Sequence, residues 1–346
     1  MTDTTTPIDT SIGGLLNKIG VEAVWFEMGR RVQPLGRGEV LAFEAGQSPY
    51  PYPLLRKAWL GVLFWSPESR AHPSVWFFKL SLDEQGLIDP AVRDDFIRHV
   101  AEQLSRASDE VEGDSMPENP HAFSPSQERL AMFHALASKL LGNPGSRFYA
   151  NARDYFSGES GFDGWRFLGM QGIADVVARL DEDDNAAHLA AAIENLPIEP
   201  LGPLCACLEN QVTPVAIARA LAARLDTAST ADEAATLLRG LSLSVAPGVR
   251  DTAVRKLLAG PHARQAEVLA AIVNRVWESL FDESIRVLFL DALADNSLGQ
   301  ELFDEAMFDL SYLPGSRTSL LSSLRDPARS EALSEAVGRW FQRLGV

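Results

Sequence analysis

The chain has 346 residues, a formal net charge of −16 and an isoelectric point near 4.8. Such a charge repels nucleic acids and anionic membrane surfaces at long range, which argues against both as partners. Hydrophobic residues make up 46% of the chain and charged residues 23%, as in an ordinary folded protein long enough for two domains. The first seven residues lack a basic, apolar leader, and no apolar run approaches the roughly 18 residues of a membrane span. We therefore expect a soluble, cytoplasmic protein.

The N-terminal third carries the patterns of a small antiparallel sheet with helices packed against it. A short helix is predicted over Ile8–Ile19. Val21–Val32 and Val40–Phe43 are rich in β-branched and aromatic residues and are separated by a glycine turn, so they predict a β-hairpin. Trp59–Trp65 and Val75–Leu82 are the strongest predicted strands.

The sheet region ends in a helix and is followed by a change of composition. A helix from Pro90 to about Ser105 is expected to pack on the sheet and to complete an α+β domain at residues 1–106. Residues 107–123 interleave carboxylates with Gly and Pro and predict an acidic linker. Residues 124–166 are predicted to contain connecting helices.

Residues 167–346 show an internal repeat of helical pairs. They divide into Phe167–Leu196, Pro197–Thr227, Thr230–Gly260, His262–Asp295 and Ser297–Pro327, with one further helix after them. The second helix of each block ends on an aliphatic residue every 31 to 35 residues, which is typical of helical-hairpin repeats. One hairpin cannot bury its apolar face alone, so neighbours must stack. We therefore predict an α+β N-terminal domain followed by an all-α helical-repeat domain, a HEAT-like α-solenoid; a compact, non-repeating bundle is the alternative.

The sequence carries no recognisable catalytic signature. It lacks a Walker loop, GxGxxG, GxSxG and HExxH, and its six histidines are scattered. Cys205 and Cys207 lie two apart on a predicted helix, point to nearly opposite sides, and are interpreted as buried apolar residues. Asp181–Asp184 is interpreted as a solvated turn rather than a cation site. We expect no metal and no cofactor, and whether the protein is an enzyme stays open.

Three clusters have the composition of interface anchors, in which aromatic and arginine side chains bury large area at modest entropic cost. The first contains Arg30, Arg31, Tyr50 and Tyr52; the second Arg147, Tyr149, Arg153 and Tyr155; the third Asp309, Tyr312 and Arg317. All are candidate partner-binding residues. For each cluster the alternative is a purely structural role inside the fold.

Several segments resemble an uncharacterised family of gamma-proteobacteria that is classed as a domain of unknown function. They are Phe26–Val32, Pro49–Leu54 with Ala58–Leu60, Leu82–Gly86 with Arg93–Phe96, and Asp309–Arg317 running into Leu321–Pro327. The resemblance covers most of the chain and implies a bacterial cytoplasmic protein. It supplies no activity, cofactor or catalytic residue.

These observations favour a non-enzymatic scaffold or adaptor that presents a helical-repeat surface to another protein. An acidic groove would favour a partner with a basic segment. The alternative is an enzyme, a hydrolase or transferase, with a site between the α+β domain and the repeat array. The sequence does not indicate an oligomeric state.

Overall fold

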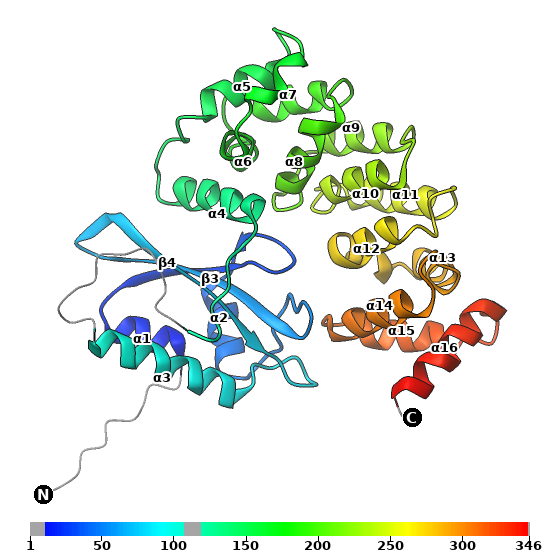
Figure 1. Ribbon diagram of the computed structural model, residues 1–346, viewed down its shortest axis with the longest axis horizontal. Helices are drawn as coiled ribbons and strands as arrows, with labels where there is room; N and C mark the ends of the chain where they lie inside the picture. Colours follow the sequence, from blue (N-terminus) through cyan, green and yellow to red (C-terminus); the bar gives the residue numbers. More distant parts are fainter. Residues whose placement is uncertain (1–10, 107–118, 345–346) are drawn as a thin grey trace, which may run out of the picture. The chain divides into compact units, whose positions relative to one another are not determined.

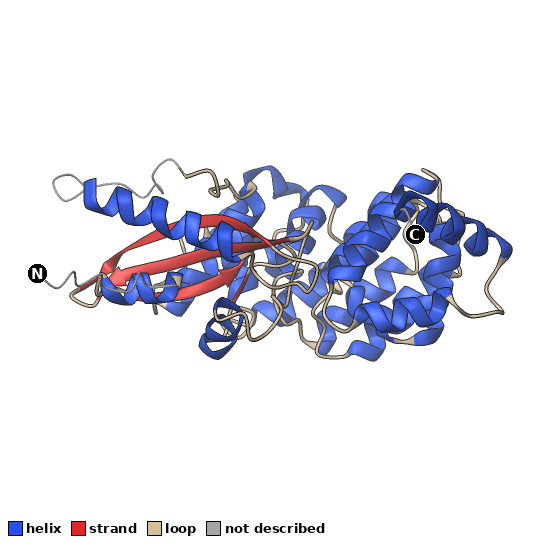
Figure 2. Ribbon diagram, turned by 90° about the horizontal axis from the view of Figure 1, so that it is seen from below, coloured by secondary structure: helices blue, strands red, loops and turns tan. Residues whose placement is uncertain are grey.

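The computed structural model describes residues 11–106 and 119–344, and the chain divides into two compact units, Met1–Pro125 and Ser126–Val346 (Figure 1). Among the described residues, strands longer than an isolated bridge occur in the first unit, and the second unit is built of helices (Figure 2). The predicted order of an α+β region followed by an all-α region is therefore confirmed. No helix in the described part of the chain combines the length and apolarity needed to cross a bilayer.

The first unit is organised by a four-stranded antiparallel sheet. Its strands are β1 (Glu22–Glu27), β2 (Gln33–Pro34), β3 (Lys57–Ser66) and β4 (Ser69–Ser81), in the order β2-β1-β3-β4. Val62 of β3 lies opposite Trp25 of β1 and Trp76 of β4, so the three side chains share one face. This face is the core, and α1 (Ile12–Lys18), α2 (Arg37–Glu44) and α3 (Pro90–Arg106) contact the sheet or one another around it.

The predicted hairpin between Val21–Val32 and Val40–Phe43 is wrong in its second half. Val40 and Phe43 lie in α2, where their spacing of three residues places both on the buried helix face. Glu39 accepts a hydrogen bond from the backbone N–H of Gly36 and stabilises the start of this helix. A short apolar run fits a strand and a buried helix face equally well, so periodicity could not separate them.

Part of the predicted linker belongs to the first unit. The backbone N–H of Lys79 donates to the carbonyl of His121 (2.8 Å), and that of Phe123 donates to the carbonyl of Phe77 (3.2 Å). The Phe123 ring packs edge-on against Trp59, with ring centroids 4.9 Å apart. Residues 119–123 therefore extend the β4 edge of the sheet, and the remainder of the predicted linker, residues 107–118, lies outside the described residues.

The second unit consists of consecutive helical hairpins. Its helices are α4 (Gln127–Leu140), α5 (Tyr149–Ser157), η1 (Asp163–Phe167), α6 (Met170–Ala178), α7 (Asn185–Ala192), α8 (Ile198–Leu208), α9 (Val215–Leu225), α10 (Ala231–Gly240), α11 (Pro247–Leu258), α12 (Ala266–Arg275), η2 (Trp277–Phe281), α13 (Glu283–Ala294), α14 (Gln300–Tyr312), α15 (Ser316–Leu324) and α16 (Glu331–Leu344). Each predicted block contains one pair, from α6 and α7 to α14 and α15. The α4–α5 segment, predicted as connecting helices, packs on α6 and α7 as a further hairpin.

Alternate helices of the second unit contact one another. One row runs α4, α6, α8, α10, α12, α14, and the other runs α5, α7, α9, α11, α13, α15, while α16 packs on both α13 and α14 (Figure 1). Because every hairpin reverses the chain, the connections inside successive hairpins lie along the same edge, which we call the turn edge. It comprises residues 179–184, 209–214, 241–246, 276–282 and 313–315.

Hydrogen bonds join neighbouring connections of the turn edge. Thr213 forms a short parallel bridge with Ser244: its N–H donates to the carbonyl of Leu243 (2.9 Å), and its carbonyl accepts from Val245 (3.1 Å). These two turns, residues 209–214 and 241–246, are thus held side by side by backbone contacts as well as by the packed helices.

Candidate functional site

The first predicted cluster is organised around a buried carboxylate in the first unit. Glu27 accepts hydrogen bonds through Oε1 from the backbone N–H groups of Gly29 (2.7 Å) and Arg30 (2.5 Å), and through Oε2 from the hydroxyl of Tyr50. Arg30 Nε donates to the carbonyl of Pro53 (2.7 Å). Burial and then the charge of Glu27 raise the pKa of Tyr50 well above its usual value. Arg30 and Tyr50 are 0% exposed, so in this structure they hold two loops together.

The other two members of this cluster lie nearby and differ in exposure. Arg31 is 3% exposed, whereas Tyr52 is half-buried, with its ring edge-on to Tyr50 at 6.4 Å. Burial raises the pKa of Tyr52, and the charge of Arg31 opposes that shift. The partner-binding role of this cluster stays a prediction. Arg30 is buried and Tyr52 is only half-buried, so a partner would contact Tyr52 first.

The structure brings the second cluster into contact with the acidic turn Asp181–Asp184, which lies some 30 residues further along the chain. The Tyr149 hydroxyl donates to Asp183 Oδ2 (2.9 Å), and Arg153 Nη1 lies 3.3 Å from the same oxygen. Asp183 and Asp184 adopt left-handed backbone conformations, with φ of 49° and 56°. Non-glycine residues adopt this conformation rarely, so the contacts from α5 help to hold the turn in place.

A buried ion pair lies beneath this turn. Arg179 and Asp175 are 2% and 1% exposed, and Arg179 Nη1 lies 3.2 Å from Asp175 Oδ1. Asp175 Oδ2 also accepts from the N–H of Ser146 (2.9 Å), and Arg179 Nη2 donates to the carbonyl of Asn143 (3.1 Å). The guanidinium carbon is 5.6 Å from the centre of the Tyr149 ring. This network connects α6 to the loop between α4 and α5.

An open, polar hollow lies beside the acidic turn. It is lined by Arg153, Asp154, Ser157, Glu159, Ser160, Asp183, Asp184 and His188. Its four carboxylates face one arginine, so the hollow favours a cationic group. Of the remaining cluster members, Tyr155 donates to the carbonyl of Phe162 (2.9 Å), and burial raises the pKa of Tyr155 to about 12. The Arg147 guanidinium lies 4.8 Å from the centre of the Phe148 ring.

The third predicted cluster lies at the α14–α15 turn, and its members differ in environment. Asp309 is 6% exposed, Tyr312 is half-buried with its ring 5.3 Å from that of Phe308, and Arg317 is exposed on the first turn of α15. The exposed member that a partner could reach directly is Arg317.

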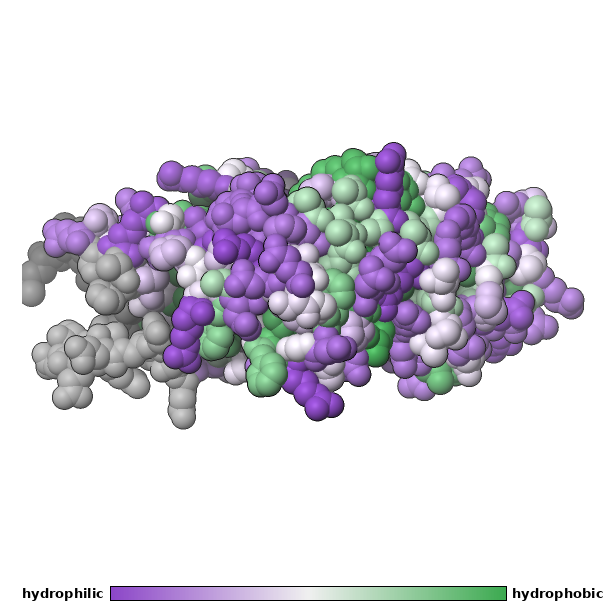
Figure 3. Space-filling view, turned by 90° about the horizontal axis from the view of Figure 1, so that it is seen from above, coloured by the Kyte–Doolittle hydropathy of each residue, from purple (hydrophilic) through white to green (hydrophobic). Residues whose placement is uncertain are grey.

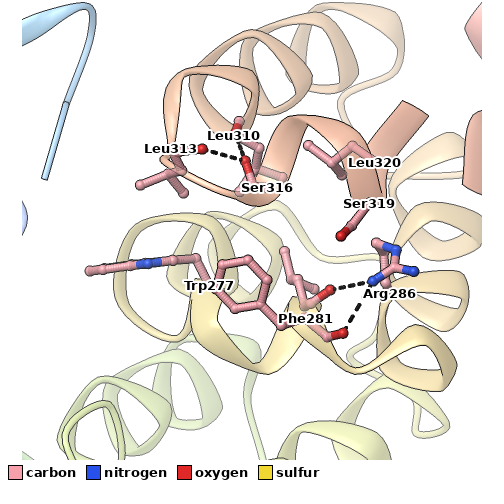
Figure 4. Close-up of a pocket in the computed structure, with 9 residues that line it drawn as sticks. Trp277, Phe281, Arg286, Leu310, Leu313, Ser316, Ser319 and Leu320 are labelled. Carbon is pink, nitrogen blue, oxygen red and sulfur yellow. Dashed lines mark hydrogen bonds between the residues drawn. The ribbon is translucent and has the colours of Figure 1, made fainter. Parts of the chain in front are cut away.

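Sequence reasoning missed a slot next to this turn, which we call the Arg286 slot (Figure 4). It is lined by Trp277, Leu280, Phe281, Arg286, Leu310, Leu313, Ser316, Ser319 and Leu320. Arg286 is 6% exposed; its Nε donates to Ser323 Oγ (2.8 Å), and its Nη1 donates to the carbonyls of Leu280 (2.9 Å) and Phe281 (3.3 Å). In the sequence, the feature that could have indicated this slot is Arg286, a charged residue among the apolar residues that form the buried face of α13.

The chain matches, over residues 8–341, the family model described as Protein of unknown function (DUF3549). The chain belongs to this family. The resemblance that the sequence indicated is thereby confirmed. No curated protein and no solved structure matches the chain.

A further buried ion-pair network of this DUF3549 chain is centred on Glu209, and residues 11–106 and 119–344 contain no group of three or more His, Cys, Asp or Glu side chains that could hold a metal ion. Glu209, 2% exposed, receives Arg239 Nε at 2.7 Å and Arg275 Nε at 2.8 Å, and burial lowers the pKa of Arg275 to about 10. Cys205 and Cys207 are 0% exposed, as predicted, and burial raises the pKa of the Cys205 thiol to about 12. Such a thiol is a poor nucleophile.

Proposed function

We propose that this DUF3549 protein is a protein-binding scaffold whose helical unit is a HEAT-like α-solenoid that presents its turn edge to another protein. The main observation in support is that each of three successive hairpin connections along this edge exposes a large apolar side chain. Val212 is 60% exposed, Val245 is 53% exposed and Phe281 is 49% exposed. The bacterial and cytoplasmic setting expected from the sequence is part of this proposal.

The arrangement of these side chains supports an interface. Single exposed apolar residues are ordinary on protein surfaces, whereas a contiguous set is typical of a binding surface. The bridge between Thr213 and Ser244 holds the Val212 and Val245 turns side by side, and Val215 adds a further apolar side chain, 37% exposed. Figure 3 shows hydrophobic surface gathered over the helical unit between hydrophilic areas.

The charge of the chain favours a partner that carries a basic segment. The net charge is −16, and the hollow beside Asp183 and Asp184 is lined mainly by carboxylates. Complementary charge raises the association rate and orients the partner, while the apolar turn edge supplies contact area. Tyr149 and Arg153 position Asp183 for this role.

Affinity capture from a native bacterial extract with the full chain tests the proposal. The Val212→Asp/Val245→Asp variant should lose the captured protein, because two charges replace the apolar contacts. Both positions are more than half exposed, so the melting temperature should stay within about 2 °C of the original. Ile198→Asp is a matched control, because Ile198 is 48% exposed at the start of α8, on the edge opposite the turn edge.

The outcomes separate the two surfaces. Equal capture by the wild-type chain and by Val212→Asp/Val245→Asp would show that the turn edge is not the interface. Loss of capture in Tyr149→Ala/Arg153→Ala, with the melting curve retained, would place the predicted second cluster in the interface as well.

A further inference from the structure

A groove between α9 and α11, which we call the α9–α11 groove, provides an apolar cavity outside the sites described above. It is lined by Ala222 of α9 and by Gly248, Val249, Thr252 and Ala253 of α11, and an ion pair lies at one end. Because these five residues are small or short, the two helices leave a volume of about 240 Å³ between them. A water molecule takes about 30 Å³ and most small-molecule sites span roughly 300–1,000 Å³. The groove therefore suits one or two aliphatic side chains of a larger partner better than a whole ligand.

The groove opens at the turn edge, because α9 and α11 both begin there. Val215 precedes Ala222 by seven residues, and Asp226 follows Ala222 by four, so the three residues lie along one stripe of α9. Val215 is 37% exposed, and Val245, which lies just before α11, is 53% exposed. The exposed apolar surface of the turn edge therefore continues into the groove.

The other end of the groove carries charged groups. Lys256 Nζ lies 2.6 Å from Asp226 Oδ2, and the two side chains are 59% and 45% exposed. A pair this exposed is weak, so a cation from a partner can reach Asp226 without disturbing the fold. α9 ends at Leu225 and α11 at Leu258, and the free carbonyl groups of both last turns add partial negative charge at this end. This end of the groove therefore favours a basic side chain.

We propose that the α9–α11 groove receives an amphipathic helix of the partner protein, with one or two aliphatic side chains in the groove and a lysine or arginine at Asp226. The inference rests on the proposed function, since it names the segment that the partner presents beside the turn edge. A helix fits because the groove runs between two parallel helices, and the residues that line it from α11 are four apart, as are the side chains on one face of a partner helix. The basic residue complements both Asp226 and the net charge of −16.

Two glycine substitutions test the groove with a model peptide. Gly248 and Gly338 are both exposed helix residues, and a Cβ added at either would meet nothing within 4 Å. Leucine has a higher helix propensity than glycine, so neither Gly248→Leu nor Gly338→Leu should lower the melting temperature. Gly248→Leu places a side chain in the groove, whereas Gly338→Leu in α16 is the matched control.

The probe is a fluorescein-labelled amphipathic helix of leucine and lysine, and its binding to the full chain is measured by fluorescence anisotropy. Gly248→Leu should weaken binding at least tenfold relative to Gly338→Leu. A scrambled peptide of the same composition has no apolar face and should bind at least tenfold more weakly to the wild-type chain. No binding of the helix to the wild-type chain, equal binding by the two variants, or equal binding of the two peptides would contradict the proposal.

A change of charge tests where the basic residue binds. Lys256→Glu removes the cation beside Asp226 and adds a carboxylate, so it should tighten binding of the leucine and lysine peptide at least threefold. Arg339→Glu makes the same change in net charge at another exposed ion pair, with Glu335 in α16, and should leave binding nearly unchanged. Equal effects of the two variants would show that only the net charge matters, and would overturn the position given to the basic residue.

Capture from a native extract distinguishes a wrong groove from a wrong scaffold. Gly248→Leu should lose the protein whose capture depends on Val212 and Val245, whereas Gly338→Leu should retain it. If both glycine variants capture that protein as well as the wild-type chain does, the groove proposal is wrong and the scaffold proposal stands. If the wild-type chain captures nothing while the model peptide binds in the groove, the scaffold proposal is wrong instead.

Discussion

Arg179 and Arg286 are both buried arginines of the helical unit, but the fold neutralises only one of them. Arg179 pairs with Asp175 at 3.2 Å and lies 3.6 Å from Glu182. Arg286 donates to Ser323 and to two backbone carbonyls, all of them neutral acceptors. The two side chains are 2% and 6% exposed, so the difference lies in their partners and not in their burial.

This difference separates an arginine that is ion-paired inside the fold from one that has only neutral hydrogen-bond acceptors. The Arg179 pair is complete within the fold and fixes the loop between α4 and α5 through Ser146 and Asn143. Arg286 instead links α13 to Ser323 and to the carbonyls of Leu280 and Phe281 through neutral acceptors. Two comparisons of variants test this interpretation, and a third measurement concerns an exposed ion pair.

The largest effect is expected from Asp175→Asn. The change keeps the shape of the side chain but leaves the Arg179 charge buried without its closest carboxylate, which typically costs about 3–5 kcal/mol of unfolding free energy. Urea denaturation followed by circular dichroism measures the loss. Asp183→Asn is the matched control, since its pair with Arg153 is solvent-exposed and worth about 0–1 kcal/mol. Equal losses for the two variants would contradict the structural role given to the buried pair.

A smaller but more direct comparison is Arg179→Met against Arg286→Met. Removing Arg179 strands the carboxylate of Asp175, whereas removing Arg286 strands no charged group and leaves carbonyl acceptors short of a donor. We expect Arg179→Met to be the more destabilising by about 2 kcal/mol in the same urea measurement. If Arg286→Met costs as much as Arg179→Met, then Arg286 is needed for folding to the same extent, and the contrast between them fails.

The smallest effect concerns the exposed pair of Lys139 and Asp181 and depends on pH. The side-chain hydrogen bond from Lys139 holds the pKa of Asp181 below its usual value of 3.8. Because the folded protein favours the ionised form, the contribution is present above that value and is lost as the pH falls below it. Asp181 is 71% exposed, so solvent screening limits Asp181→Asn to about 0.5 kcal/mol at pH 7. The difference should shrink progressively in chemical denaturation as the pH falls below 3.8; an undiminished difference at low pH would assign it to something other than the ion pair.

The helical part of the fold could be predicted from the sequence because its signals are local. Apolar residues three and four apart mark the buried faces, and each predicted block from Phe167 to Pro327 contains one helical pair of the structure. The site could be predicted only in part. Tyr149 and Arg153 were recognised by composition, but their contact with Asp183 joins residues some 30 positions apart, beyond any local pattern.

By itself, the sequence determined the order of the two regions, the hairpin period, the burial of Cys205 and Cys207, and membership of an uncharacterised family. Tertiary structure alone decided that Val40 and Phe43 lie on a helix, because a short run of apolar residues is compatible with both a strand and the buried face of a helix. It also decided which buried arginine is neutralised. Whether a carboxylate stands within reach of a guanidinium depends on packing between helices, and sequence spacing does not encode that distance.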